Sequence, residues 1–145
     1  MAGQTTGLQK TYTLINGAIS KNTVVTRGPA DGSCAIPLTD NEIPLGVVTN
    51  DAKETVAPSV GGSQIGRNVA VQLSGIAEVE LAESVNYGDM VIVAANGKVK
   101  PMPQTAGGGL FFILGFAEAS GNAGDIIPVT INISSVYIAN APDSN

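Results

Sequence analysis

The chain has no histidine, no tryptophan and a single cysteine, Cys34, among its 145 residues. Without histidine, neither a Ser-His-Asp triad nor a Cys-His nucleophile pair can form, and no imidazole can bind a metal ion. One cysteine cannot make an internal disulfide or a thiolate zinc site. We therefore expect a protein that is not an enzyme and holds no metal or cofactor, in which Cys34 is a buried, inert thiol.

Charged residues are also scarce, at 13% of the chain against roughly a quarter in typical globular domains. The seven basic residues are scattered and the net charge is −5, so we expect no binding to nucleic acid.

Apolar runs such as Val91–Ala95 and Leu110–Leu114 are five residues long, far short of the ~20 needed to cross a bilayer. The N-terminal MAGQTTGLQK lacks the apolar core of a signal peptide. We expect neither membrane insertion nor secretion.

Short apolar stretches that alternate with polar residues and end at Gly, Asn, Asp or Pro are typical of β-strands. The clearest are Val69–Leu73 and Ile76–Leu81, and Gly75 between them is expected to form a bulge or corner. Further strands are expected at residues 11–14, 22–26, 43–49, 110–117, 126–133 and 135–138. No window of about 12 residues carries a helical apolar stripe, so the sequence predicts an all-β barrel or sandwich with little helix.

One hairpin is predicted from Asn96-Gly97, which separates the apolar run ending at Ala95 from Lys98–Lys100. Asn-Gly tolerates positive φ at both central positions, which favours a two-residue type I′ turn. Pro101 and Pro103 follow, and neither can donate a hydrogen bond to a neighbouring strand. The returning strand is therefore expected to stop there.

The second half of the chain repeats landmarks of the first half in the same order. Leu45–Val48 and Gly66–Leu73 resemble Leu114–Ala117 and Gly124–Ile131. The sequence therefore predicts two related β-units, about 18–75 and 84–133, which close one barrel-like body together. They form a single β domain, 13–133, between an N-terminal arm, 1–12, and a C-terminal tail, 134–145.

Glu78, Glu80 and Glu83 are the main cluster of carboxylates, and Glu78 and Glu80 project from one face of a predicted strand. Paired carboxylates can serve a glycosidase or bind Ca²⁺. However, the chain has three Phe, three Tyr and no Trp to stack on sugars. We favour a solvated face or a subunit contact, and the alternative is a ligand- or carbohydrate-binding β module that uses the Glu78/Glu80 face.

Two glycine-rich stretches and one lysine resemble parts of known binding sites, but the residues that such sites require are absent around them. Gly61-Gly62 and Gly107–Gly109 precede neither a helix nor a Lys-Ser/Thr pair, so they are expected to be loops rather than phosphate-binding turns. Lys98 follows a hairpin turn, as does the modified lysine of lipoyl and biotinyl domains, but Asn96-Gly97 occupies the tip here.

Several short motifs in order resemble one known family. They are Leu45–Val48, Val71–Val79, Val85–Val91 and Asn96–Val99. The chain from about 13 to 133 resembles the small decoration, or cement, proteins of tailed-bacteriophage heads, which implies a β-tulip-like barrel with an extended N-terminal arm. The loop 52–64 and the tail after Ile133 depart from the compact family pattern.

The resemblance implies a structural virion protein, made in the host cytoplasm, whose homotrimers bind the outer surface of the expanded capsid and clamp major capsid subunits. The phage lambda head decoration protein has a related role. Under this resemblance, the alternative ligand- or carbohydrate-binding β module would belong to a phage appendage. An arm with free backbone groups can add to an exposed sheet edge with little sequence demand. The residues expected to form this capsid-binding arm are Gln4, Thr5, Thr6, Leu8, Gln9, Lys10, Thr11 and Tyr12.

Overall fold

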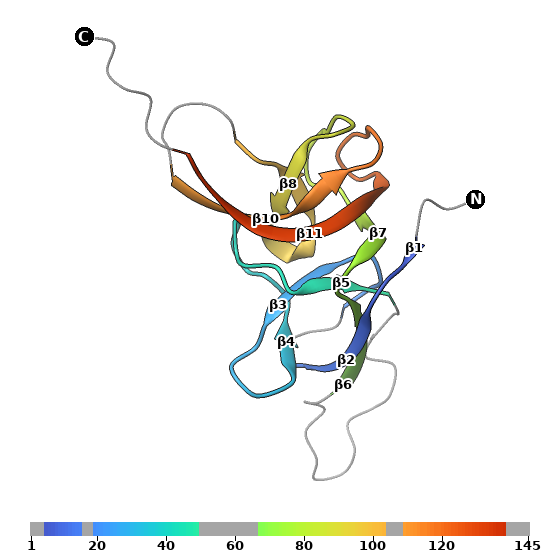
Figure 1. The fold of residues 1–145 in the computed structure, drawn as a ribbon. Helices are drawn as coiled ribbons and strands as arrows, with labels where there is room; N and C mark the ends of the chain where they lie inside the picture. Colours follow the sequence, from blue (N-terminus) through green and yellow to red (C-terminus); the bar gives the residue numbers. More distant parts are fainter. Residues whose placement is uncertain (1–4, 16–18, 50–66, 104–108, 139–145) are drawn as a thin grey trace.

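The computed structural model describes residues 5–15, 19–49, 67–103 and 109–138, and it is all-β as predicted. Two β-units lie one above the other (Figure 1). The lower unit is a closed barrel of five strands in the order β2-β4-β3-β5-β6. Its strands are β2 (Gln9–Leu14), β3 (Val24–Arg27), β4 (Ser33–Ala35), β5 (Gly46–Val48) and β6 (Arg67–Gln72).

The upper unit is a six-stranded sheet in the order β1-β7-β11-β10-β8-β9. Its strands are β1 (Thr5–Thr6), β7 (Gly75–Glu80), β8 (Met90–Val93), β9 (Val99–Pro101), β10 (Gly109–Ala117) and β11 (Ile126–Ile138). Just beyond β7, Leu81 forms a parallel bridge with Val99 of β9, which brings the two sides of the sheet together.

The two units share one topology. Going around the barrel, β2-β4-β3-β5-β6 correspond to β7-β9-β8-β10-β11, and each antiparallel pair has an antiparallel counterpart. The parallel pair β2–β4 corresponds to the parallel bridge between Leu81 and Val99. The register agrees as well, because Val25 lies opposite Gly46 in one unit and Val91 lies opposite Gly115 in the other. Each structural unit includes a strand, β2 or β7, that the predicted bounds 18–75 and 84–133 leave out of it, and the duplication stays a prediction.

Gly46 and Gly115 occupy equivalent places where two strands approach very closely. A Cβ atom on Gly46 would lie 2.4 Å from the carbonyl oxygen of Gln72, and one on Gly115 would lie 1.7 Å from that of Thr130. Real Cβ atoms do not come within 3.0 Å of such atoms. Both positions therefore need glycine because the neighbouring backbone fills the space of a side chain.

The two units are joined by a shared hydrophobic core. In β3, Val25 packs with Tyr12 and Val71 inside the lower barrel, whereas Val24 packs with Val79 and other residues of the upper unit. Alternate residues of one strand thus face two different cores, as the period of two requires. The units consequently form one body rather than two separable domains.

Gly75 marks a corner, as predicted. It has φ +84 and lies where the chain leaves β6 of the barrel and enters β7 of the upper sheet. The N-terminal strands cross at the same place, since Thr6 pairs with Gly75 and Gln9 pairs with Gln72. Two antiparallel strands therefore run side by side from one unit into the other.

The predicted N-terminal arm is wrong for its second half. Residues Gln9–Leu14 form β2, which pairs with β6 along its length and with β4 at its end. Tyr12 is only 4% exposed and belongs to the barrel core. Tyr12 and Leu14 alternate with exposed or half-buried residues and both face the core, which fixes this segment as a strand of the barrel.

The predicted hairpin is confirmed, but its turn has three residues. Val93 pairs with Val99, and the Ala94 N–H donates to the Lys98 carbonyl, so Ala95–Gly97 form the loop. Asn96 and Gly97 have the expected positive φ, 70° and 83°. Gly97 also packs against the start of β3, where an added Cβ would meet the side chain of Thr23, just before the strand, and lie 2.7 Å from the Val24 carbonyl oxygen. The longer turn thus contacts the lower unit, and the local sequence does not reveal this contact.

The other strand predictions are largely confirmed, with three differences. β11 is continuous from Ile126 to Ile138, so Ser134–Ile138 belong to the sheet and not to the predicted tail. Two short strands, β1 and β4, were not predicted, because two or three residues carry no periodicity. The predicted loop 52–64, the Gly61-Gly62 pair and residues 139–145 lie outside the described residues.

Candidate functional site

Of the residues predicted for the capsid-binding arm, those from Thr5 to Thr11 lie at the junction between the two units, whereas Tyr12 is buried in the lower barrel. Thr5 and Thr6 pair with β7, and Gln4 lies outside the described residues. The Leu8 N–H donates to Ser74 Oγ, 2.9 Å away, and its carbonyl accepts from the Leu73 N–H. These bonds fix the backbone within the fold. Capsid binding by this segment stays a prediction.

Side chains of this segment nevertheless reach the surface. Leu8 is 64% exposed, and Gln9, Lys10 and Thr11 are exposed as well. The Lys10 ammonium lies 5.3 Å from the ring centroid of Tyr12, which holds this basic group against the barrel wall. The segment thus presents side chains on a rigid strand rather than a free backbone.

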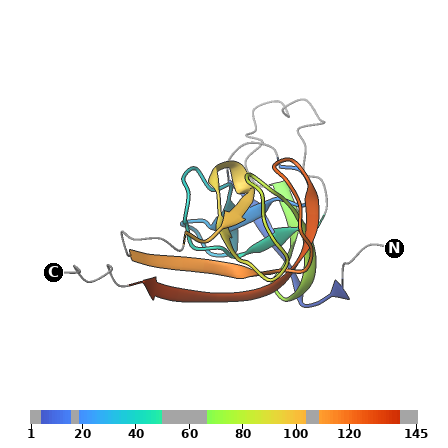
Figure 2. The same cartoon turned by 90° about the horizontal axis from the view of Figure 1, so that it is seen from above.

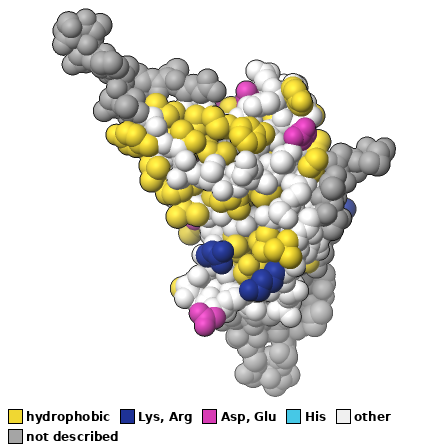
Figure 3. All heavy atoms as spheres, in the orientation of Figure 1, with side chains coloured by type: hydrophobic (Ala, Val, Ile, Leu, Met, Phe, Trp, Pro, Cys, Tyr) yellow, Lys and Arg dark blue, Asp and Glu magenta, His cyan; other side chains and the backbone are white. Residues whose placement is uncertain are grey.

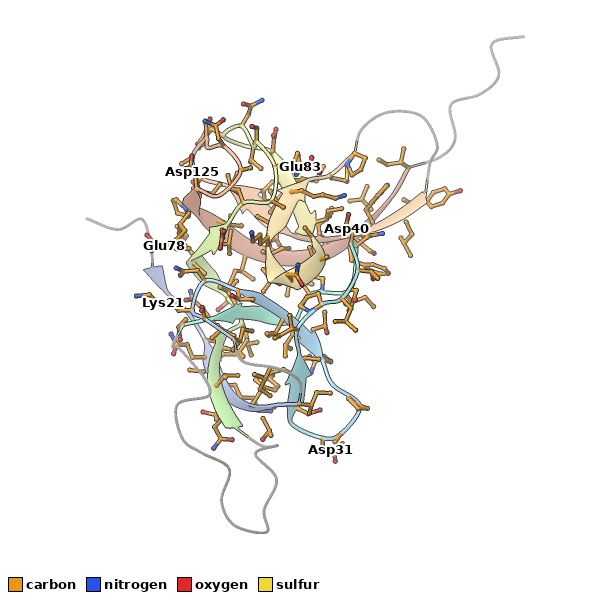
Figure 4. All side chains as sticks on the ribbon, turned by 180° about the vertical axis from the view of Figure 1, so that it is seen from behind. Lys21, Asp31, Asp40, Glu78, Glu83 and Asp125 are labelled. Carbon is orange, nitrogen blue, oxygen red and sulfur yellow. The ribbon has the colours of Figure 1, made fainter. Side chains whose placement is uncertain are left out.

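The glutamates do not converge on a site. Glu80 pairs with Lys98, whose Nζ lies 3.3 Å from its carboxylate, and Glu78 and Glu83 stand apart in Figure 4. Glu78 borders a cavity of about 120 Å³, smaller than the roughly 300–1,000 Å³ of typical ligand sites. Among the described residues, no group of three or more potential ligands could hold a metal ion. The Glu78/Glu80 face is therefore a poor fit to a bound sugar.

Cys34 is fully buried among the apolar residues of the lower barrel, as predicted. Burial raises the pKa of its thiol to about 11, because the apolar surroundings disfavour the charged thiolate. The thiolate is the reactive form. Cys34 is therefore held in its unreactive state at neutral pH.

A clasp at residues 37–41, missed in the sequence, joins the two units. The Pro37 carbonyl accepts from the Asn96 N–H, and the Asn41 N–H donates to the Val93 carbonyl. Asp40 accepts from the Ala95 N–H and from Lys100, and these hydrogen bonds, that of Lys100 foremost, lower the pKa of its carboxyl group. Nothing local marks this clasp, since its partners lie more than 50 positions away.

Asn41 covers one edge of β10. Its side-chain amide donates to the Leu110 carbonyl at 2.9 Å, and its side-chain oxygen accepts from the Phe112 N–H at 3.0 Å. The amide thus takes the place of a neighbouring strand beyond the point where β8 stops pairing with β10. Asn41 has φ +65, a conformation that asparagine tolerates better than most residues.

Exposed apolar side chains gather at the far end of the β10–β11 hairpin. On one face, Leu110 and its cross-strand partner Tyr137 are 48% and 70% exposed, and Ile133 is 40% exposed. On the other face, Phe111 and Val136 pack only partly against the small cluster around Met102. Figure 3 shows hydrophobic side chains above and below the β11 backbone. This end of the hairpin is a candidate interaction surface.

A groove lies between this hairpin and the lower barrel. It has a volume of about 460 Å³ and is lined by Thr26, Arg27, Asn41, Glu42, Ile43 and Phe112. Ile43 is 57% exposed, so apolar surface continues from the hairpin toward the barrel.

The far end of β11 is an open sheet edge. β11 pairs with β7 only from Ile126 to Ile131, while its pairing with β10 continues to Ile138. Among the described residues, no strand covers the other side of Asn132–Ile138. Figure 2 shows β11 outermost beside β10 along this stretch.

Within the part of the chain that the structure describes, no helix is long and apolar enough to span a membrane. No family model and no curated protein matches the sequence. Among solved structures, the fold is similar to the N-terminal base of the head fibre protein gp8.5 of bacteriophage phi29, at 15% sequence identity and a TM-score of 0.60. The similarity covers 86% of this chain and 95% of that one, so the two proteins share a fold.

Proposed function

We propose that this protein is a structural, non-enzymatic component of a phage virion that binds the outer surface of the expanded head as homotrimers and stabilises the head by clamping neighbouring major capsid subunits. The observation that carries this proposal is the fold shared with the base of a phage head fibre over 86% of the chain. The ordered motifs that resemble phage decoration proteins point to the same class independently.

The proposed contact with the capsid uses side chains held on a rigid wall. Leu8, Lys10 and Thr11 project from the N-terminal strands, whose backbone is already paired with β6 and β7. Three such surfaces on one trimer would act together, so that modest individual contacts give firm attachment. A rigid surface also loses less conformational entropy on binding than a free arm.

The proposal is tested by mixing the purified protein with expanded, undecorated heads of the phage that carries its gene. We expect a trimer by light scattering, saturable binding to the heads, density at local three-fold positions by cryo-electron microscopy, and heads that resist heating better. A monomer that does not bind expanded heads would contradict the proposal.

Point variants test the binding surface better than a truncation, because deletion of residues 1–12 would remove most of strand β2. Leu8→Asp is expected to weaken head binding without unfolding the protein, since Leu8 is 64% exposed. Leu38→Asp is the matched control, because Leu38 is 72% exposed and lies in the clasp region. Equal binding by both variants would remove Leu8 from the proposed contact.

A further inference from the structure

We propose that the far end of β11, Asn132–Ile138, pairs antiparallel with the same segment of a second copy of this chain, about a two-fold axis at Ser135. The pairing goes beyond the proposed function, because it would join two copies whether or not each already belongs to a trimer. It rests on an open edge, on the side-chain pattern of that edge, and on the distribution of charge.

Asn41 reveals which backbone groups face the open edge. It binds the Leu110 carbonyl and the Phe112 N–H, so these groups point away from β11. Their cross-strand partners, Tyr137 and Ser135, therefore form pairs without hydrogen bonds to β10. The N–H and carbonyl groups of Ser135 and Tyr137 point outward and are available to another strand.

Two usual protections of an edge strand are missing in this segment, which begins at a bulge where the register of β11 against β10 shifts at Asn132–Ile133. Edges are normally blunted by charges, proline, bulges or a covering element. Residues 132–138, NISSVYI, contain no charge and no proline. By contrast, β9 ends at Pro101 and is bridged to Leu81 at Val99, and Asn41 covers the open part of β10. Among the described residues, the free edges of β9 and β10 thus have a partner, whereas this end of β11 has none.

The side-chain pattern of the segment is self-complementary. With Ser135 opposite Ser135 of the second copy, Ile133 lies opposite Tyr137 and Ser134 lies opposite Val136. A two-fold contact needs this reciprocity. Ile133 and Tyr137 are 40% and 70% exposed in the single chain, and β-branched and aromatic side chains pair well across antiparallel strands.

Charge favours a second copy at this surface. Each copy carries a net charge of −5, so identical chains repel one another over most orientations. The uncharged segment 132–138 is a place where two copies can meet without opposing like charges. Figure 3 shows hydrophobic side chains around β11, which can add apolar contact to main-chain pairing.

The first test is the mass of the full-length protein as its concentration rises. We expect a species of twice the basal mass: a dimer if the basal state is a monomer, a hexamer if it is a trimer. Tyr137→Lys should abolish the doubled species, because it opposes a charge to Ile133 of the second copy. Tyr87→Lys is the matched control, since Tyr87 is also 70% exposed and lies elsewhere, and it should leave doubling unchanged.

The outcomes separate this pairing from the proposed trimer. A trimer that never doubles overturns the pairing and leaves the trimer standing. A monomer that doubles supports the pairing and contradicts the trimer. Equal effects of the two lysine variants overturn the assignment to β11.

The second test is a cysteine cross-link that reads the register. Ser135→Cys would place two Cα atoms about 5.5 Å apart across the axis, within the range for a disulfide. In Ser134→Cys the two cysteines would lie on a diagonal of about 7–8 Å, which is out of reach. Buried Cys34 does not compete. We expect oxidation to link most of the Ser135→Cys protein and little of the Ser134→Cys protein, and equal linking would overturn the register.

Discussion

The substitution Gly115→Ala tests the close approach of β10 and β11 most directly. The added Cβ would lie 1.7 Å from the Thr130 carbonyl oxygen, so that oxygen must retreat by at least 1.3 Å to reach the 3.0 Å that real structures keep. The oxygen belongs to a backbone held in the sheet between β7 and β10 and cannot swing aside as a side chain can.

The expected cost follows from that displacement. Overpacking a tight site costs roughly 1–3 kcal/mol, and each cross-strand hydrogen bond that is broken adds about 1 kcal/mol. We therefore expect Gly115→Ala to lower the free energy of unfolding by about 2–4 kcal/mol. At the equivalent Gly46, where the distance is 2.4 Å and the required retreat is smaller, we expect about 1–3 kcal/mol.

Urea denaturation followed by circular dichroism measures both effects. Gly124→Ala is the control, because nothing lies within 4 Å of its added Cβ and only its φ of +90 is unfavourable, at roughly 1–2 kcal/mol. If Gly115→Ala costs no more than Gly124→Ala, the reasoning from close approach is refuted.

Three further predictions concern the clasp and the thiol. Asn41→Gly should lower the free energy of unfolding by about 1–3 kcal/mol, because two hydrogen bonds are lost. Asn41→Ala should lower it further, because alanine tolerates the positive φ at this position less well than glycine. Equal free energies of unfolding for the two variants in urea denaturation would contradict this. The pKa of Asp40 is lowered in the folded state, so this carboxylate stabilises the fold above its unfolded pKa of about 3.9, and the stabilisation is lost as the pH falls through the folded pKa. In Asp40→Asn, the melting temperature should therefore depend less on pH below about pH 4 than it does in the unsubstituted protein. Native Cys34 should react with a thiol reagent only as fast as the barrel opens, and rapid labelling of the folded protein at pH 8 would exclude its burial.

The sequence predicted those parts of the fold that depend on local pattern. Asn96 and Gly97 adopt positive φ, Gly75 turns the chain between the units, and Val79 and Leu81 face the core together. Each follows from the steric freedom of one residue or from the period of a strand.

Features set by distant contacts were missed. Gln9 and Lys10 carry no apolar alternation of their own, and they become part of the barrel by pairing with β6, more than 60 positions later. The extra turn residue at Ala95 accompanies a hydrogen bond to Asp40, 55 positions earlier. The open edge of β11 was also invisible, because it depends on where β7 stops pairing and not on the residues of β11 themselves.

The order β1-β7-β11 has a consequence for mechanical load. β1 and β11 both run antiparallel to β7, so they point the same way on its two sides. If Thr5 were fixed to one body and Ile138 to another, tension between them would slide both strands along β7 instead of peeling either away. Sliding strains the hydrogen bonds of a strand pair together, whereas peeling breaks them singly, and forced unfolding depends on that barrier. Because β1 pairs with β7 only through Thr5 and Thr6, whereas β11 pairs with it from Ile126 to Ile131, the β1–β7 contact should yield first under such a load.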